Sequence, residues 1–239
     1  MKVSLFVTCL GDLFYVRASQ ATVELLEHLG CEVSFHHAQT CCGQPAYNSG
    51  YHKQAKDVAK HIIKTFQKDE YVVTPSGSCA YMLHTYPSLF SSDDEWREMA
   101  EELKQKTYEL TQFITDVLNI TDVGASFQAT ATYHTSCHMT RLLGVQHSPF
   151  TLLSNVKGLQ LIPLQNEGVC CGFGGTFAVS MSNISGEMVE EKVSCIESTN
   201  AEYVIGADAG CLLNISGRIG YKKLAVKSIH IAEVLNNGR

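Results

Sequence analysis

The sequence lacks the features that would place it in a membrane or on a nucleic acid. It has no apolar run near the roughly 20 residues that a membrane-spanning helix needs. Its apolar start at residues 3–7 is followed by Asp12 and Arg17 and by no small-residue cleavage site. We therefore expect a buried first strand there, and neither a signal peptide nor a membrane span. Lys and Arg number only 18 against 24 Asp and Glu and are dispersed, so we expect no nucleic-acid partner.

The chain also lacks the common motifs of nucleotide and hydrolase sites. No Walker loop, zinc-protease helix or serine-nucleophile elbow is present, and the glycines of residues 172–175 lack the spacing of a dinucleotide fingerprint. Without a secretion signal we expect the chain in the cytoplasm, where reducing conditions favour metal or redox roles for cysteine over disulfides. The acidic stretch at 93–102 is typical of a solvated helix face.

Cysteine is abundant, with ten in 239 residues. Eight of them form two copies of one pattern: a single Cys, a Cys-Cys-Gly unit and a further Cys. The first copy is Cys9, Cys41, Cys42 and Cys79, and the second is Cys137, Cys170, Cys171 and Cys211. The spacings nearly match, with 32 and 33 residues before the doublet and 37 and 40 after it. Since packing alone does not demand paired cysteines at matched intervals, we interpret each copy as four ligands of one metal site. Soft thiolates select iron–sulfur clusters, zinc or copper(I).

The internal repeat extends beyond the cysteines. Residues 70–73 read Glu-Tyr-Val-Val, and residues 202–205 read Glu-Tyr-Val-Ile, each a few positions before the last Cys of its copy. Self-similarity over so long a period indicates a duplicated domain rather than a solenoid. We therefore predict two cysteine-rich repeats, at residues 1–120 and 128–239.

Each half alternates between strand and helix patterns. The strands expected in the first half are 3–7, 32–36 and 71–74, and its helices are 21–29, 54–66 and one long or two shorter helices over 96–118. The second half is expected to repeat this with strands near 131–133, 159–162, 203–205 and 226–229 and a helix at about 181–197. This alternation predicts an α/β fold with two open, mostly parallel sheets flanked by helices. Ligands of such sheets bind beyond the carboxyl ends of the strands, where we expect one site per half.

Four stretches resemble a known family: 40–50, 134–141, 170–177 and 230–235. They are similar to the CCG cysteine-rich domain found in heterodisulfide reductases and in the iron–sulfur subunits of glycolate oxidases. Within that superfamily the resemblance is strongest to the lactate utilization protein A family, and it covers essentially the whole chain. The resemblance implies a cytoplasmic iron–sulfur protein needed for oxidation of L-lactate to pyruvate. It also implies companion lactate utilization proteins B and C as partners.

The sequence departs from the fullest form of the family pattern at two positions. That form ends in Cys-x-x-Cys and supplies five thiolates, but here Ser76 and Asp208 replace the first Cys of the pair. Four sulfurs per half remain, enough for an ordinary 4Fe–4S cluster. We expect Ser76 and Asp208 to cap helices, with oxygen ligation of a metal as the alternative.

Three functions remain open at this point. The leading hypothesis is an electron-transfer subunit, accessory rather than catalytic, in an L-lactate oxidoreductase complex. It would carry two iron–sulfur clusters, with zinc as the less favoured metal. We expect His138 and Arg141, which flank Cys137 as His134 does, to lie near a cluster and raise its reduction potential. The alternatives are a catalytic redox subunit that binds a hydroxy acid or thiol at an open iron, and a zinc-stabilised scaffold.

Overall fold

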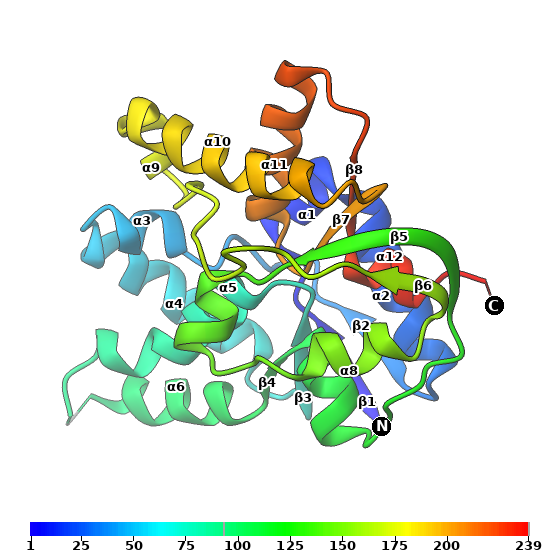
Figure 1. The fold of residues 1–239 in the computed structure, drawn as a ribbon. Coiled ribbons are helices and arrows are strands. Elements are labelled where there is room, and N and C mark those ends of the chain that lie inside the picture. The colour runs from blue at the N-terminus through cyan, green and yellow to red at the C-terminus, as the bar shows by residue number, and fades with distance from the viewer. Residues whose placement is uncertain (93, 239) are drawn as a thin grey trace.

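The computed structural model describes residues 1–92 and 94–238 and contains two four-stranded sheets (Figure 1). The first sheet is formed by β1 (Lys2–Leu5), β2 (Glu32–Phe35), β3 (Tyr71–Thr74) and β4 (Thr107–Glu109). The second is formed by β5 (Ser126–His134), β6 (Lys157–Leu161), β7 (Tyr203–Gly206) and β8 (Lys227–His230). Their strand orders, β2-β1-β3-β4 and β6-β5-β7-β8, are the same, and every pairing among the described strands is parallel. The predicted fold class is confirmed.

Helices flank both sheets. Those of the first half are α1 (Cys9–Phe14), α2 (Val16–His28), α3 (Gln44–Asn48), α4 (His52–Phe66), α5 (Gly77–Thr85), α6 (Glu95–Gln105) and α7 (Leu110–Gln112). Those of the second half are α8 (Ser148–Ser154), α9 (Phe177–Ser180), α10 (Ser182–Ser198), α11 (Ala209–Lys222) and α12 (Ile231–Leu235). Tighter or wider turns form η1 (Tyr86–Leu89), η2 (Phe113–Val117) and η3 (His138–Leu142). The stripe Ala55, Ala59, Ile62, Ile63 and Phe66 gives α4 its buried face.

The long helix expected over 96–118 is interrupted by a strand. The helix ends at Gln105, and Thr107–Glu109 then pairs in parallel with β3. The β-branched and aromatic side chains of Thr107 and Tyr108 suit an extended backbone, and the exposed edge of β3 supplies the hydrogen-bond partners. The corresponding strand of the second half, β8, lies at the position predicted for it.

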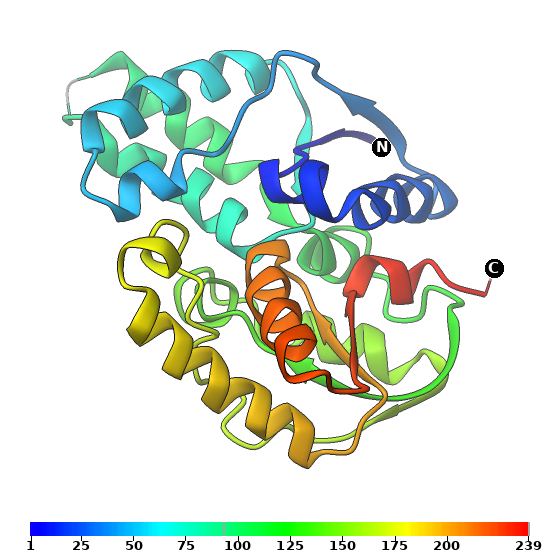
Figure 2. The same cartoon turned by 90° about the horizontal axis from the view of Figure 1, so that it is seen from above.

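The two halves share one core. Its largest cluster of buried side chains takes Val3, Leu25 and Phe113 from the first half and Leu152 and Ile231 from the second. Figure 2 shows the halves facing each other, with the terminal helix α12 of the second half against α2 of the first. In return, α7 of the first half contacts α8 of the second. The division at residues 1–120 and 128–239 stays a prediction, because the shared core ties the two sheets together.

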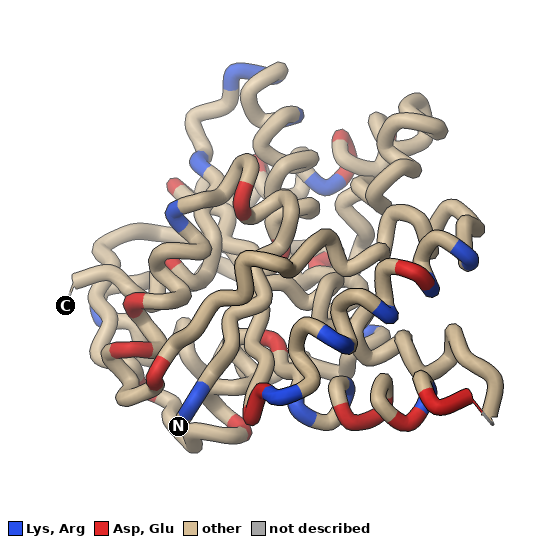
Figure 3. The backbone as a smooth tube through the Cα atoms, turned by 180° about the vertical axis from the view of Figure 1, so that it is seen from behind, with Lys and Arg blue, Asp and Glu red and all other residues tan. Residues whose placement is uncertain are grey.

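Acidic residues lie along α6, as the backbone view shows (Figure 3). Glu95, Glu98 and Glu102 are exposed there, as the sequence predicted for a solvated face, while Asp93 lies outside the described residues. Among the described residues, no helix combines the length and the apolarity that crossing a bilayer would need.

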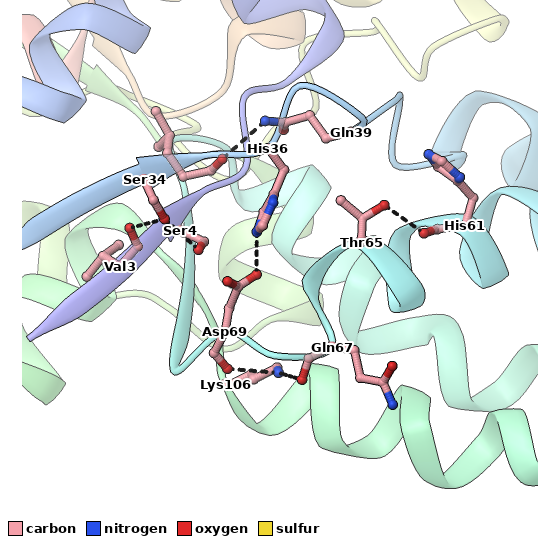
Figure 4. Close-up of polar contacts among 11 residues, drawn as sticks. Val3, Ser4, Ser34, His36, Gln39, His61, Thr65, Gln67, Asp69 and Lys106 are labelled. Carbon is pink, nitrogen blue, oxygen red and sulfur yellow. Dashed lines mark hydrogen bonds and ion pairs between the residues drawn. The ribbon is translucent and has the colours of Figure 1, made fainter.

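Hydrogen bonds at the first sheet's edge fix the loop that carries the first cysteine doublet (Figure 4). The Gln39 amide accepts from Val7 N at 2.8 Å and donates to the Leu5 carbonyl at 3.3 Å. Beside it, His36 Nε2 lies 2.8 Å from Asp69 Oδ2. These contacts hold the end of β2 against the end of β1, so the loop after β2 returns to the segment that carries Cys9.

Candidate metal centre

All eight repeated cysteines line one cavity between the halves, at the carboxyl ends of the strands. They are Cys9, Cys41, Cys42, Cys79, Cys137, Cys170, Cys171 and Cys211. In each sheet the strand that comes first in the chain, β1 or β5, lies between two neighbours. The next strand pairs on one side of it and the third strand on the other, so the strand order reverses there. Such a switch point leaves a crevice beyond the strand ends, where open α/β sheets bind their ligands.

The first thiol set comes from three connections of the first sheet. Cys9 begins α1, the doublet Cys41-Cys42 lies between β2 and α3, and Cys79 lies in the first turn of α5. The Sγ atoms of Cys9 and Cys41 are 3.7 Å apart, and those of Cys42 and Cys79 are 3.4 Å apart. Cys42 and Cys79 are buried, whereas Cys9 and Cys41 are partly exposed. The set therefore has an inner pair and an outer pair.

The second thiol set repeats this arrangement. Cys137 and Cys170 form the outer pair, with 4.0 Å between their Sγ atoms, and both are partly exposed. Cys171 and Cys211 form the buried inner pair, and their Sγ atoms lie within 4.8 Å of each other. The predicted convergence of four sulfurs per half is thus present in both halves.

A glycine follows each doublet because the backbone there is left-handed. Gly43 has φ of 84° and Gly172 has φ of 79°, a conformation that is strained for other residues. The turn points the Gly43 N–H at Cys41 Sγ, 3.5 Å away, and the Gly172 N–H at Cys170 Sγ, 3.4 Å away. The Cys-Cys-Gly unit therefore supplies two sulfurs and one backbone donor.

These donors stabilise one thiolate in each set. Hydrogen bonds from the thiols of Cys42 and Cys9, with the Gly43 N–H, lower the pKa of Cys41 to about 3. The same arrangement in the second set lowers the pKa of Cys170 to about 2. Donating to that thiolate raises the pKa of Cys9, and burial adds to the effect. A metal that binds must therefore displace protons from the other thiols of each set.

The donor chemistry of both sets fits a metal. Four sulfurs per half suit an iron–sulfur cluster or tetrahedral zinc. The inner thiols are shielded from water, and the cavity wall between the sets includes Leu10, Pro45 and Phe173. Thiolates in such surroundings hold a metal by charge and are protected from oxidation by restricted access.

Ser76 and Asp208 cap helices, as predicted. Ser76 Oγ accepts from Cys79 N at 3.3 Å at the start of α5, and Asp208 Oδ1 accepts from Gly210 N at 3.1 Å at the start of α11. Asp208 also crosses to the other half, where its Oδ2 accepts from Ser76 Oγ at 3.1 Å and Ser78 N at 2.9 Å. The residues that replace sulfur therefore join the two sites.

The two predicted neighbours of Cys137 lie differently. His138 lines the cavity, and its Nδ1 is 3.5 Å from Cys137 Sγ. Arg141 is exposed and donates to the carbonyl of Gly168, so it holds the loop that leads to Cys170. Among the described residues that line the cavity Arg141 is not found. The roles of both in tuning a metal centre stay predictions.

Two buried residues near the second set carry ionisable groups: His134, which flanks Cys137 in the sequence, and Lys192, which the sequence analysis did not identify. His134 is 1% exposed, and burial together with the Lys192 charge lowers its pKa to about 4. The His134 ring is therefore neutral at pH 7 in the metal-free protein. Lys192 is fully buried and donates to the carbonyls of Asn166 at 2.9 Å and Glu167 at 3.1 Å. Lys192 lies on the buried stripe of α10, and its helical spacing from the other residues of that stripe was the available sequence signal for its burial.

Two parallel sheets, each with a doublet-containing thiol set at its strand ends, define a duplicated cysteine-rich class of protein. The family described as CCG, cysteine-rich domain, matches this chain twice, over residues 3–84 and 131–216. Each of the two matched segments contains one complete thiol set.

Full-length relatives narrow this class. Lactate utilization protein A of Geobacillus sp. strain WCH70 is 65% identical over 237 residues, covering 99% of this chain and 100% of that protein. The protein of the same name from Bacillus subtilis strain 168 is 61% identical over 237 residues, with the same coverage. The chain therefore belongs to the lactate utilization protein A family. A glutamate racemase structure from Francisella tularensis covers 98% of this chain and 78% of its own, at 13% identity and a TM-score of 0.37, a likeness too low to support an argument.

Proposed function

We propose that this chain acts in lactate utilization as an electron-transfer subunit that carries two iron–sulfur clusters. The observation that carries the proposal is the pair of four-thiol sets that open on one cavity. The name of the full-length relatives, lactate utilization protein A, supplies the metabolic role. On this proposal lactate is oxidised to pyruvate in a cytoplasmic complex with companion lactate utilization proteins B and C.

In this proposed function, different residues of the chain hold the clusters, stabilise their charge and fix their spacing. The eight cysteines would hold the clusters, which supply one-electron transfer when bound. The N–H groups of Gly43 and Gly172 donate to sulfur, which stabilises negative charge at each site. Asp208 and Ser76 fix the spacing between the two helices that carry Cys79 and Cys211. The buried inner thiols suit electron transfer, which needs no direct contact with a substrate.

Anaerobic reconstitution with iron and sulfide tests this proposal. We expect about eight irons and eight acid-labile sulfides per chain, for two 4Fe–4S clusters, and paramagnetic resonance signals after reduction. A variant with Cys31→Ser and Cys195→Ser serves as the control, because both residues lie outside the thiol sets and should leave the iron count unchanged. An iron content well below two clusters per chain would contradict the proposal.

A zinc site is the second candidate, because three of the sulfur–sulfur distances match those around tetrahedral zinc. Tetrahedral zinc with bonds of about 2.3 Å places its sulfurs about 3.8 Å apart, and the contacts here are 3.4, 3.7 and 4.0 Å. An iron–sulfur cube is wider, so the thiols would have to move apart to bind it. Protein purified without oxygen that is colourless and contains about two zinc ions would support the scaffold function.

No specific observation favours the catalytic alternative. It needs an open iron beside Ser76 or Asp208, but the oxygens of both residues are engaged in helix caps and in the hydrogen bond between them. If saturating lactate changed the cluster spectrum of the isolated protein, the catalytic function would replace the electron-transfer function.

A further inference from the structure

The two sheets allow each residue near one thiol set to be compared with its equivalent near the other. Leu5 pairs with Val73 in the first sheet, and Tyr133 pairs with Ile205 in the second. The residue that follows each is therefore equivalent: Phe6 in the first half and His134 in the second. Phe6 is fully buried within an apolar cluster that also contains Cys42 and Cys79. The second half thus places an imidazole where the first half has a phenyl ring.

Within residues 1–92 and 94–238, the imidazole of His134 finds no hydrogen-bond partner. Both Nδ1 and Nε2 are buried, and neither contacts a donor or acceptor among the described residues. Leaving a buried polar group unpaired costs about 1–3 kcal/mol, whereas Phe6 shows that an apolar ring fits the equivalent position. A function for this imidazole is needed to offset that cost.

The nearest chemistry to the imidazole is the inner thiol pair of the second set. A ring nitrogen of His134 and the Sγ atoms of Cys171 and Cys211 all lie within 4.8 Å of one another, and all three residues are buried. Imidazole nitrogen and thiolate sulfur are joint ligands in zinc sites and in mixed-ligand iron–sulfur clusters. The three side chains therefore form a compact donor group at the inner end of the cavity.

We propose that His134 is a nitrogen ligand of the metal centre in the second half. That centre then has five available donors, four sulfurs and one nitrogen, while the centre of the first half has four sulfurs. The nature of the metal rests on the proposed function, but the ligand assignment applies to iron or zinc alike. A cubane cluster or a tetrahedral zinc ion takes four protein ligands, so the His134 nitrogen would take the place of one thiolate. In a cluster, this replacement of thiolate by neutral imidazole raises the reduction potential. The second centre is therefore the more easily reduced of the two.

Nitrogen couplings in the reconstituted protein test the assignment. Full-length chain labelled with ¹⁵N-histidine is loaded anaerobically with iron and sulfide, reduced, and studied by pulsed electron paramagnetic resonance beside unlabelled protein. We expect one strongly coupled histidine nitrogen that changes with the isotope. The coupling is lost in His134→Phe, which copies the first half, and kept in His138→Gln, although His138 touches Cys137 Sγ.

Two results would overturn the assignment. One is the absence of any strongly coupled histidine nitrogen in wild-type protein that contains both clusters, a readout that needs no variant to fold. The other is a coupling that disappears in His138→Gln and survives in His134→Phe.

A second probe separates this inference from the proposed function. If iron and sulfide form no cluster, cobalt(II) added to the metal-free thiols still reports the ligands. We expect a paramagnetically shifted, exchangeable imidazole N–H in the proton magnetic resonance spectrum that His134→Phe abolishes. Cobalt binding with that signal but no cluster would contradict only the proposed function. Clusters without nitrogen coupling, or cobalt–thiolate absorption without the imidazole signal, would contradict only the inference.

Discussion

The two halves of the chain share a scaffold and a thiol set but differ in what surrounds the sulfurs. Their strand orders are the same, and their doublets are followed by the same left-handed glycine. Around the first set the equivalent positions hold Phe6 and Ile62, which are apolar, and around the second they hold His134 and Lys192. The repeat therefore keeps the eight sulfurs in matching positions and changes the charge and polarity beside them, so the two proposed metal centres should differ in their properties.

The largest effect on the difference between the halves is expected from removal of one inner thiol, which should eliminate one metal centre. We expect Cys171→Ser, made together with His134→Phe because His134 is the proposed fifth donor, to lose the second centre and about half of the bound metal, since the other three sulfurs cannot complete the site. Cys42→Ser, its equivalent, should lose the first centre instead. Metal analysis with paramagnetic resonance of each variant then assigns one signal to each half. If either substitution removed all the metal, the two sites would depend on each other.

A second difference between the halves concerns the helix caps after β4 and β8. Glu109 caps α7 and His230 caps α12 at equivalent positions in the two sheets. Burial raises the pKa of Glu109 from 4.5 to about 7 and lowers the pKa of His230 from 6.5 to about 4. The Glu109 contribution to stability is present below pH 4.5 and is lost as the pH rises to about 7. The His230 contribution is present above pH 6.5 and is lost as the pH falls to about 4.

These opposing contributions predict opposite effects of two substitutions on pH dependence. At about 1.4 kcal/mol per pKa unit, each contribution is about 3 kcal/mol. Relative to wild type, Glu109→Gln should remove the loss of unfolding free energy between pH 4.5 and 7. His230→Gln should remove the gain over pH 4 to 6.5. Urea unfolding of metal-free protein across this range measures both differences. Parallel curves for wild type and Glu109→Gln would show that Glu109 is ionised in the fold.

The parts of this structure that the sequence predicted depend on local or repeated signals. The thiol sets, the caps at Ser76 and Asp208, and the strand–helix alternation all repeat or follow a short-range period. The strand Thr107–Glu109 was missed because three residues carry too little pattern, and only pairing with β3 makes them extended. The burial of Lys192 could not be predicted from the sequence, because it depends on hydrogen bonds to the carbonyls of Asn166 and Glu167 in a distant loop.

The two doublet glycines should differ in their tolerance of a side chain. A Cβ on Gly172 would meet the Ser185 carbonyl oxygen at 2.7 Å, whereas a Cβ on Gly43 would meet the Val58 side chain at 3.2 Å. Both substitutions to Ala also carry the left-handed penalty of about 1–2 kcal/mol. We expect Gly43→Ala to lose about that much unfolding free energy and Gly172→Ala to lose clearly more, because backbone cannot move as Val58 can. Equal losses would mean that the second loop relaxes freely.

The smallest effect expected is a selective shift in reduction potential from the buried Lys192. Burial lowers the pKa of Lys192, and the nearby thiols, among them Cys170, Cys171 and Cys211, partly offset that shift. Salt screens a charge interaction between buried groups only weakly. Lys192→Met keeps the length of the side chain and removes the charge, so the second centre should become harder to reduce while the first is unchanged. Lys222→Met is the matched control, because Lys222 is paired with Glu190 at 2.7 Å near the surface. A redox titration that showed both centres shifting equally in Lys192→Met would mean that the charge acts on the whole cavity, and the contrast between the halves would then depend on His134 alone.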